Sequence, residues 1–171
     1  GDEKIPYCDV KHKISFERSP FRLNNLKAIK QLRKIIKKEK YEIIHTHTPM
    51  GAVVTRLAAI RARKKGTRVI YTAHGFHFYK GAPLLNWLLY YPVEKFLLRY
   101  TDVLITINKE DYHRIQKFKA GKIVYVPGVG IDLTKFGQAA VDKSAKRKEL
   151  GIPENATLLL SVGELNENKN H

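Results

Sequence analysis

Histidines and small polar residues gather in four short runs of the sequence, and these are the residues with the chemistry to form an active site. The runs are 45–49 (His-Thr-His-Thr-Pro), 72–77 (Thr-Ala-His-Gly-Phe-His), 106–108 (Thr-Ile-Asn) and 127–132 (Pro-Gly-Val-Gly-Ile-Asp). Imidazoles can bind a metal ion, or exchange hydrogen bonds and protons with a substrate.

Two kinds of chemistry are open to the histidines of these runs, which are His45, His47, His74 and His77. Neutral imidazoles suit zinc or copper, but no acidic residue or cysteine accompanies them at a diagnostic spacing, so we expect no metal. For His45 we expect a hydrogen bond within the edge of a sheet. For His74 we expect contact with a ligand, because Gly75 permits close approach and Phe76 begins an aromatic run that can form an apolar wall.

Hydrophobic periodicity places the runs at the ends of expected β-strands. Apolar stretches at 42–47, 68–73, 103–107, 122–126 and 157–162 predict strands, and helical patterns alternate with them at 24–38, 51–65, 83–100, 109–117 and 142–150. We expect a break near Pro92 in the 83–100 helix. The alternation predicts an α/β fold, a Rossmann-like parallel sheet with helices on both faces. In such sheets ligands bind beyond the carboxyl ends of the strands, where the polar runs lie.

The chain is strongly basic, and its charge is concentrated. Its 171 residues include 32 Lys and Arg against 16 Asp and Glu, and residues 11–40 and 61–80 carry +15 of the net charge of +16. Two concentrated patches are typical of a protein with a polyanionic partner, either nucleic acid or an anionic membrane surface, and a solvated lysine-rich helix is the alternative. The helix expected at 24–38 has an apolar stripe of Leu26, Ile29, Leu32 and Ile36. Its candidate membrane-surface residues are Lys27, Lys30, Arg33, Lys34, Lys37 and Lys38.

Composition argues against several classes of protein. A hydrophobic content of 43% can fill a core, and the single Cys8 excludes an intramolecular disulfide framework. The longest apolar stretch, 84–93, is interrupted by Asn86 and Pro92 and is shorter than the roughly 20 residues of a spanning helix. Residues 76–100 hold eight of the 17 aromatic residues, which suit a lipid–water interface. Core packing is the competing expectation, with leucines 84, 85, 88 and 89 filling one face of a helix.

The ordered motifs of the chain resemble those of the retaining glycosyltransferases of the GT-B fold, family 4, and especially their bacterial capsular and exopolysaccharide branch. The matching segments are 42–49 (EIIHTHTP), 72–81 (TAHGFHFYKG), 125–132 (YVPGVGID) with Phe136, and 161–171 (SVGELNENKNH). Such enzymes have two Rossmann-like domains, the first holding mainly the acceptor and the second mainly the nucleotide-sugar donor. The resemblance implies that this chain is the first part of such an enzyme.

The resemblance also implies roles for individual residues. His74 matches the family histidine that faces the donor sugar, so it is the expected catalytic residue, able to hydrogen-bond a sugar hydroxyl or the leaving phosphate. Lys169 matches the basic residue that meets the donor diphosphate. Gly130 and Asp132 match the loop before the interdomain linker, where the carboxylate is expected to fix loop geometry. The other expected donor-binding residues are Gly75, Gly163 and Glu164, and the other expected acceptor or cleft residues are His45, His47, Phe76, His77, Thr106 and Asn108.

This sequence departs from the family pattern in three places. Glu164 stands where an arginine commonly binds the diphosphate, which a carboxylate cannot do. The family's first strand and glycine-rich turn are not visible ahead of Gly1, and its Glu-x7-Glu donor motif would lie beyond His171. We therefore expect residues 1–155 to form the acceptor-side domain without its first strand, residues 156–171 to begin the donor-binding domain, and the chain to be inactive by itself.

The predicted function is a portion of a retaining hexosyltransferase of polysaccharide biosynthesis. It would use a nucleotide sugar, UDP-linked, without cofactor or metal, and a lipid-linked or polysaccharide acceptor. It would act in the cytoplasm, peripherally at the inner face of the cell membrane. The alternative is a basic nucleic-acid-binding module, which only the charge supports; no RNP motif, zinc spacing or helix-turn-helix accompanies it, so we expect no nucleic-acid partner.

Overall fold

The fold is known from a computed structural model, which describes residues 6–17, 22–128, 130, 132–137, 141–160 and 162. The chain divides into two compact units, Gly1–Val129 and Gly130–His171. Among the described residues, the first unit contains a β-sheet with its helices, and the second contains two short helices. The expected domain boundary after residue 155 stays a prediction.

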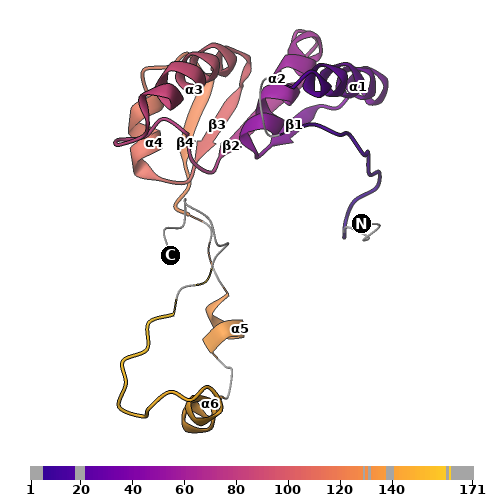
Figure 1. Ribbon diagram of the computed structural model, residues 1–171. Helices are drawn as coiled ribbons and strands as arrows, with labels where there is room; N and C mark the ends of the chain where they lie inside the picture. Colours follow the sequence, from indigo (N-terminus) through magenta and orange to yellow (C-terminus); the bar gives the residue numbers. More distant parts are fainter. Residues whose placement is uncertain are drawn as a thin grey trace. The chain divides into compact units, whose positions relative to one another are not determined.

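The first unit is built on a four-stranded parallel sheet (Figure 1). Its strands are β1 (Ile43–Thr46), β2 (Arg68–Ala73), β3 (Val103–Thr106) and β4 (Lys122–Tyr125), in the order β1-β2-β3-β4. All three neighbouring pairs are parallel. The predicted α/β class and these four strands are therefore confirmed.

Helices alternate with the strands as predicted. They are α1 (Asn24–Glu39), α2 (Pro49–Arg63), α3 (Leu84–Leu97) with a 3-10 turn at Leu98–Tyr100, and α4 (Lys109–Ile115). Side chains at the strand ends start two of them. The Thr48 hydroxyl accepts a hydrogen bond from the Gly51 N–H at 3.2 Å, and the side-chain amide oxygen of Asn108 accepts one from the Asp111 N–H at 2.7 Å. Each cap satisfies a backbone donor that the first helical turn leaves free.

One face of the sheet carries the core. Val69, Tyr71 and Leu104 point to this face and are at most 1% exposed. All four helices of the described part of this unit contribute side chains to the clusters around them, among which are Ile36, Ala58, Trp87 and Ile115. By strand alternation the second face carries Ile43, which is 58% exposed, and the half-buried Ile70, Val103 and Ile105. Helix coverage of this second face stays a prediction.

The apolar stripe of α1 is confirmed except at its first member. Ile36 is 3% exposed, and Ile29 and Leu32 pack against the cluster of Ala58 and Val69. Leu26 is 57% exposed, because it lies in the first turn of α1, where the buried side chains are Asn25 and Ala28.

A buried ion pair joins α2 to α3. The Arg56 side chain is fully buried and donates two hydrogen bonds to the Glu94 carboxylate, at 2.6 and 3.1 Å. Its Nε donates to the Ala52 carbonyl at 3.0 Å, and its guanidinium lies 4.7 Å from the ring centroid of Tyr71 on β2. The pair therefore connects two helices and the sheet at a single point.

The expected break near Pro92 is wrong, since α3 is continuous through this residue. Proline cannot donate a hydrogen bond to the carbonyl four residues earlier, here that of Leu88. Both Pro92 and Leu88 are exposed, so water can solvate that carbonyl and the helix continues.

The expected packing of leucines in the same helix is also wrong. Leu84, Leu85 and Leu88 are 74, 62 and 65% exposed, and Leu89 is half-buried. The inner face of α3 is instead occupied by Trp87 and by the two tyrosines that follow it, which pack against the core cluster of the sheet.

The second unit contains α5 (Leu133–Gly137) and α6 (Lys143–Glu149). Asp142 caps α6 by accepting hydrogen bonds from the N–H groups of Ser144 and Ala145, which confirms the helix predicted at 142–150. The strand predicted at 157–162 is wrong over its described residues: 157–160 and 162 form no strand, and Leu159 is 90% exposed. A strand needs a partner for its backbone hydrogen bonds, and no described segment pairs with this one.

Candidate active site

The carboxyl ends of the parallel strands carry the predicted site residues of the first unit. Ala73 on β2 lies in register with Thr106 on β3, and Tyr71 with Thr46 on β1. The segments that leave these strands begin at His47, His74 and Ile107. Register alone therefore brings the polar runs 45–49, 72–77 and 106–108 to one edge of the sheet.

His45 makes the expected hydrogen bond within the sheet edge. Its Nε2 lies 2.9 Å from the Thr72 hydroxyl oxygen, one strand away. Burial, and secondarily the neighbouring His47, lower the pKa of His45 from its ordinary value. His45 is consequently a neutral imidazole near pH 7, and its bond to Thr72 orients its ring.

His47 and His74 meet at the sheet edge from two different strands. His74 Nε2 and His47 Nδ1 are 3.5 Å apart, and both side chains are exposed. The rings of His45 and His47 lie 4.2 Å apart between centroids, and those of His47 and His74 lie 5.7 Å apart. Three imidazoles thus form a row in which only His45 is fixed by a short hydrogen bond. Among the described residues, no group of three or more His, Cys, Asp or Glu side chains has an arrangement suited to a metal ion.

A bend follows His74 and turns the next aromatic residue into the core. Gly75 has a φ of 153°, a backbone conformation that side-chain-bearing residues rarely adopt. Phe76 is then 7% exposed and stacks on Phe78 at 4.9 Å between ring centroids. The expectation that Phe76 lines a cleft is corrected by this position, because the turn at Gly75 buries it.

His77, the other predicted cleft residue of this segment, stacks on a ring of α3. Its ring centroid lies 4.5 Å from that of Tyr90, and its side chain is exposed. The structure therefore does not group His77 with the row of three imidazoles. It joins the segment after β2 to the first half of α3.

The side chains of Thr106 and Asn108 make hydrogen bonds within the fold and do not face an open cleft. Thr106 is fully buried, and its hydroxyl lies 3.5 Å from the Val124 carbonyl oxygen. The Asn108 side chain caps α4 and also donates to the Asp111 carboxylate at 2.7 Å. Their prediction as cleft residues is corrected, because neighbouring groups already use their polar atoms.

Two acidic residues at the start of α4 hold the segment that follows His74. The Asp111 carboxylate accepts a hydrogen bond from the Phe76 N–H at 3.2 Å, and the Glu110 carboxylate accepts one from the Lys80 N–H at 3.1 Å. Arg114 pairs with both carboxylates. Its guanidinium, more than the Lys80 N–H, holds the pKa of Glu110 below the usual value.

Sequence reasoning missed these two acids. The signal that could have found Asp111 is the capping pattern of an asparagine followed three residues later by an acid, as in Asn108 and Asp111. This pattern does not identify Glu110. The contacts of the two acids anchor the bend between His74 and α3 at two backbone positions.

Two predicted site residues lie in the second unit. The Asp132 carboxylate accepts a hydrogen bond from the Thr134 N–H at 3.0 Å, at the start of α5, in agreement with the expectation that it fixes loop geometry. Gly130 is exposed. The predicted donor-binding residues Gly163, Glu164 and Lys169 lie outside the described residues.

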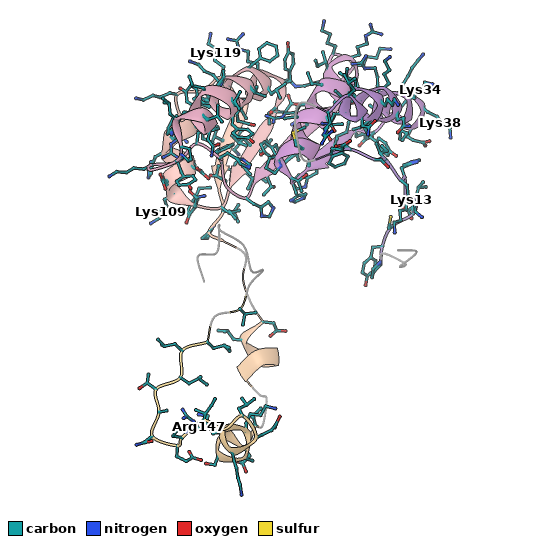
Figure 2. All side chains as sticks on the ribbon, viewed as in Figure 1. Lys13, Lys34, Lys38, Lys109, Lys119 and Arg147 are labelled. Carbon is teal, nitrogen blue, oxygen red and sulfur yellow. The ribbon has the colours of Figure 1, made fainter. Side chains whose placement is uncertain are left out.

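The basic residues of α1 lie on its outer surface. Lys34 and Lys38 extend from this helix in Figure 2, and Lys27, Lys30 and Lys37 are likewise exposed. Arg33 is exposed as well, and its guanidinium donates to the Leu57 carbonyl of α2 at 3.3 Å. In the described part of the chain, no helix is both long enough and apolar enough to cross a bilayer.

Comparison with known proteins gives consistent matches. The model of the family described as glycosyl transferase 4-like matches residues 2–108. A putative glycosyltransferase, EpsD, of Bacillus subtilis (strain 168) is 48% identical over 99% of this chain and 45% of its own length. The UDP-Gal:alpha-D-GlcNAc-diphosphoundecaprenol alpha-1,3-galactosyltransferase of Escherichia coli is 34% identical over 86% of this chain and 38% of its own. An uncharacterized 41.2 kDa protein in the cps region of Klebsiella pneumoniae is 28% identical over the whole chain and 48% of its own length. The chain thus spans less than half the length of these relatives.

Proposed function

The chain belongs to the glycosyl transferase 4-like family, and on that premise we propose that it provides the acceptor-side part of a sugar-transferring enzyme. The reaction moves a hexose, with retention, from a nucleotide sugar to a lipid-linked or polysaccharide acceptor. The observation that carries the proposal is the exposed row of imidazoles at the carboxyl edge of the sheet, which ends in His74. This edge is where open α/β sheets bind their ligands.

His74 is the proposed catalytic residue because of its surroundings. It is exposed, directly follows β2, and its one ring contact, with His47, is long at 3.5 Å. An imidazole held so loosely keeps its hydrogen-bonding capacity for a ligand. It can donate to a sugar hydroxyl or to the departing phosphate, where negative charge develops during transfer. His45, which is neutral and hydrogen-bonded to Thr72, packs against the ring of His47.

The donor is proposed to be a UDP-linked sugar, used without cofactor or metal. Cationic side chains and the N-termini of helices can stabilise a diphosphate leaving group in place of a metal ion. Gly75 is proposed to lie close to the donor, since its backbone has no side chain to exclude a ligand. Gly163, Glu164 and Lys169 are proposed donor-side residues outside the described part of the chain.

The acceptor is proposed to be lipid-linked, and the site of action the cytoplasmic face of a bacterial membrane. Support comes from the Escherichia coli relative, whose name specifies a sugar on diphosphoundecaprenol. The exposed basic residues of α1 can contact anionic headgroups, each adding about 1 kcal/mol of attraction near the surface. Nucleic acid is not a proposed partner.

A binding titration tests the proposal on the 171-residue chain. The probe is N-acetylglucosamine linked through a diphosphate to a short alkyl chain, and the readout is the side-chain NMR signals of the histidines. We expect the signals of His47 and His74 to move while that of His113, exposed on α4, stays in place. His74→Ala should weaken binding, and His113→Ala should not.

The refuting results are equally specific. No movement of His47 or His74 at about 10 mM probe, well above a 1 mM Kd worth about −4 kcal/mol, contradicts an acceptor site at this edge. Equal movement of all histidines contradicts it too. We also propose that the chain alone turns over no UDP-sugar; labelled product from UDP-galactose and the same probe would contradict that.

A further inference from the structure

The outer face of α3 is apolar, unlike the outer face of α1. Its exposed side chains include Leu84, Leu85 and Leu88, which are 74, 62 and 65% exposed, and Val93 and Phe96, which are 45 and 48% exposed. At the helical period of 100° per residue these residues and Pro92 share one side of the helix, and Lys95 is the charged residue among them. Isolated exposed leucines are ordinary, but a continuous stripe of them marks a surface that contacts something.

The inner face of α3 explains why the leucines point outward. Trp87, Tyr90 and Tyr91 pack against the core cluster, and Glu94 is held by the buried Arg56. These contacts fix the rotation of the helix about its axis. The leucine stripe is therefore held on the surface by the packing of the opposite side.

The charges around the stripe are basic. Lys80, Lys95 and Arg99 are exposed and lie before, along and after the helix. The acid in this segment, Glu94, is buried and paired with Arg56. The exposed Glu110 carboxylate lies beside Lys80, so the positive charge that complements an anionic lipid surface comes from Lys95 and Arg99.

The length and direction of α3 fix how it could meet a bilayer. Fourteen residues span about 21 Å, less than the roughly 30 Å of a hydrocarbon core, so the helix can lie on a membrane but cannot cross it. It begins shortly after the carboxyl end of β2 and returns toward the start of β3. The segment that carries His74 leads into this helix, and the stacking of His77 on Tyr90 holds that segment against α3.

We propose that the outer face of α3 is a membrane-docking surface, which inserts Leu84, Leu85, Leu88 and Phe96 among anionic lipids and holds the His74 edge near the bilayer. The choice of a lipid partner rests on the proposed function, in which the acceptor is lipid-linked. The basic face of α1 adds electrostatic attraction, whereas α3 supplies the apolar insertion.

Vesicle flotation without any sugar substrate tests the docking surface. The full chain should bind phosphatidylcholine vesicles that contain about one third phosphatidylglycerol. Leu85→Ser/Leu88→Ser should weaken binding at least about 10-fold, because binding scales with inserted apolar area. The matched control is Leu23→Ser/Leu26→Ser, which replaces two leucines of similar exposure (76 and 57%) at the start of α1 and should bind as the unchanged chain does. Thermal unfolding of each variant checks that the fold is retained.

A second measurement locates the contact without weakening it. Trp87 is the single tryptophan of the chain, so Trp87→Phe gives a background without indole fluorescence. In that background, Leu88→Trp on α3 should be quenched by vesicles of brominated lipid, and Gln31→Trp on the exposed side of α1 should not. Quenching of Gln31→Trp alone would overturn the assignment to α3.

Three other results would also overturn the docking surface. The first is no binding of the chain to anionic vesicles, and the second is an equal loss of binding in both leucine variants. The third is a chain that does not bind vesicles but associates with itself, in a way that the α3 variant abolishes. The last would identify a second copy as the occupant. Since flotation uses no sugar, vesicle binding with a failed acceptor titration would contradict only the proposed function. An intact titration without vesicle binding would contradict only the docking surface.

Discussion

The buried pair of Arg56 and Glu94 allows a quantitative test of what holds the first unit together. The Arg56 side chain is 0% exposed and makes three hydrogen bonds, two to Glu94 and one to the Ala52 carbonyl, while its guanidinium faces the ring of Tyr71. Replacing one partner by an apolar residue, in Arg56→Met or Glu94→Leu, leaves the other charge buried. We expect each single substitution to be strongly destabilising.

The magnitude follows from the burial of the pair. Breaking a buried ion pair by removing one partner costs about 3–5 kcal/mol, because the remaining charge loses both water and its counter-ion. In a chain of this size that lowers Tm by roughly 6–20 °C. Arg56→Met/Glu94→Leu removes both charges and should lie within about 1 kcal/mol of the unchanged chain, because apolar residues of similar volume can replace a buried pair.

Urea unfolding followed by circular dichroism measures these effects as a double-mutant cycle. The control is Glu149→Leu, which removes an exposed partner of Lys146 and should cost less than about 1 kcal/mol. If a single variant does not fold, the double variant should restore the folded spectrum. Single substitutions that cost no more than the control, or a double variant as unstable as the singles added together, would refute the pair as a coupled element.

Three further predictions concern the loops between strands. Gly121→Ala should destabilise the chain, because its Cβ would overlap the backbone carbonyl of Asp102, and a lowered urea midpoint measures this. Burial raises the pKa of Asp102, but its hydrogen bonds to Arg63 and to a backbone N–H together hold that pKa below the usual value. The contribution of Asp102 to stability is therefore present above about pH 4 and is lost as the pH falls through the lowered pKa. Acidification should consequently destabilise the unchanged chain more than Asp102→Asn. Parallel plots of unfolding free energy against pH for the two chains would contradict this. Asp111→Ala should speed hydrogen exchange of the Phe76 amide, measured by NMR, because it removes that amide's acceptor; unchanged exchange would show that the bend after His74 does not need the anchor.

Most of the fold of the first unit follows from local patterns. Near-continuous apolar strands such as 68–73 and 103–107 predicted a parallel sheet because they contain few polar residues. Helical periodicity predicted α2 from residue 51, two residues after its observed start at Pro49. The strand at 157–162 has the same apolar pattern but is not formed, because a strand depends on a partner that a local pattern does not contain. Periodicity therefore predicted strands well only where the sheet supplied a neighbour, whereas the helix α6 formed without one.

For the candidate site, the sequence predicted which residues share one edge of the sheet, but not which of their side chains stay open to a ligand. The ends of β1 and β2 correctly brought His47 and His74 together. Thr106 and Asn108 lie at the predicted edge, but their side chains already make hydrogen bonds. The Thr106 hydroxyl bonds to the Val124 carbonyl, and the Asn108 side chain caps α4. Strand position fixes which edge a residue lies on, whereas a local hydrogen bond decides whether its polar atoms remain available to a ligand.

A comparison of the basic helix α1 with the apolar helix α3 shows why charge alone does not locate a membrane contact. The sequence favoured α1 as the membrane surface, since residues 11–40 carry the largest concentration of charge, and for the 83–100 helix it left a lipid–water interface and core packing of the leucines both open. A helix that is apolar on nearly all sides has no pattern that identifies its inner face. In α3 the rotation is set by Trp87, Tyr90 and the Arg56–Glu94 pair, which only the tertiary structure reveals. Leucines with nothing to cover them in the described residues, on a helix that His77 contacts through Tyr90, are stronger grounds for a membrane contact than the lysines of α1, whose exposure a solvated helix explains equally well.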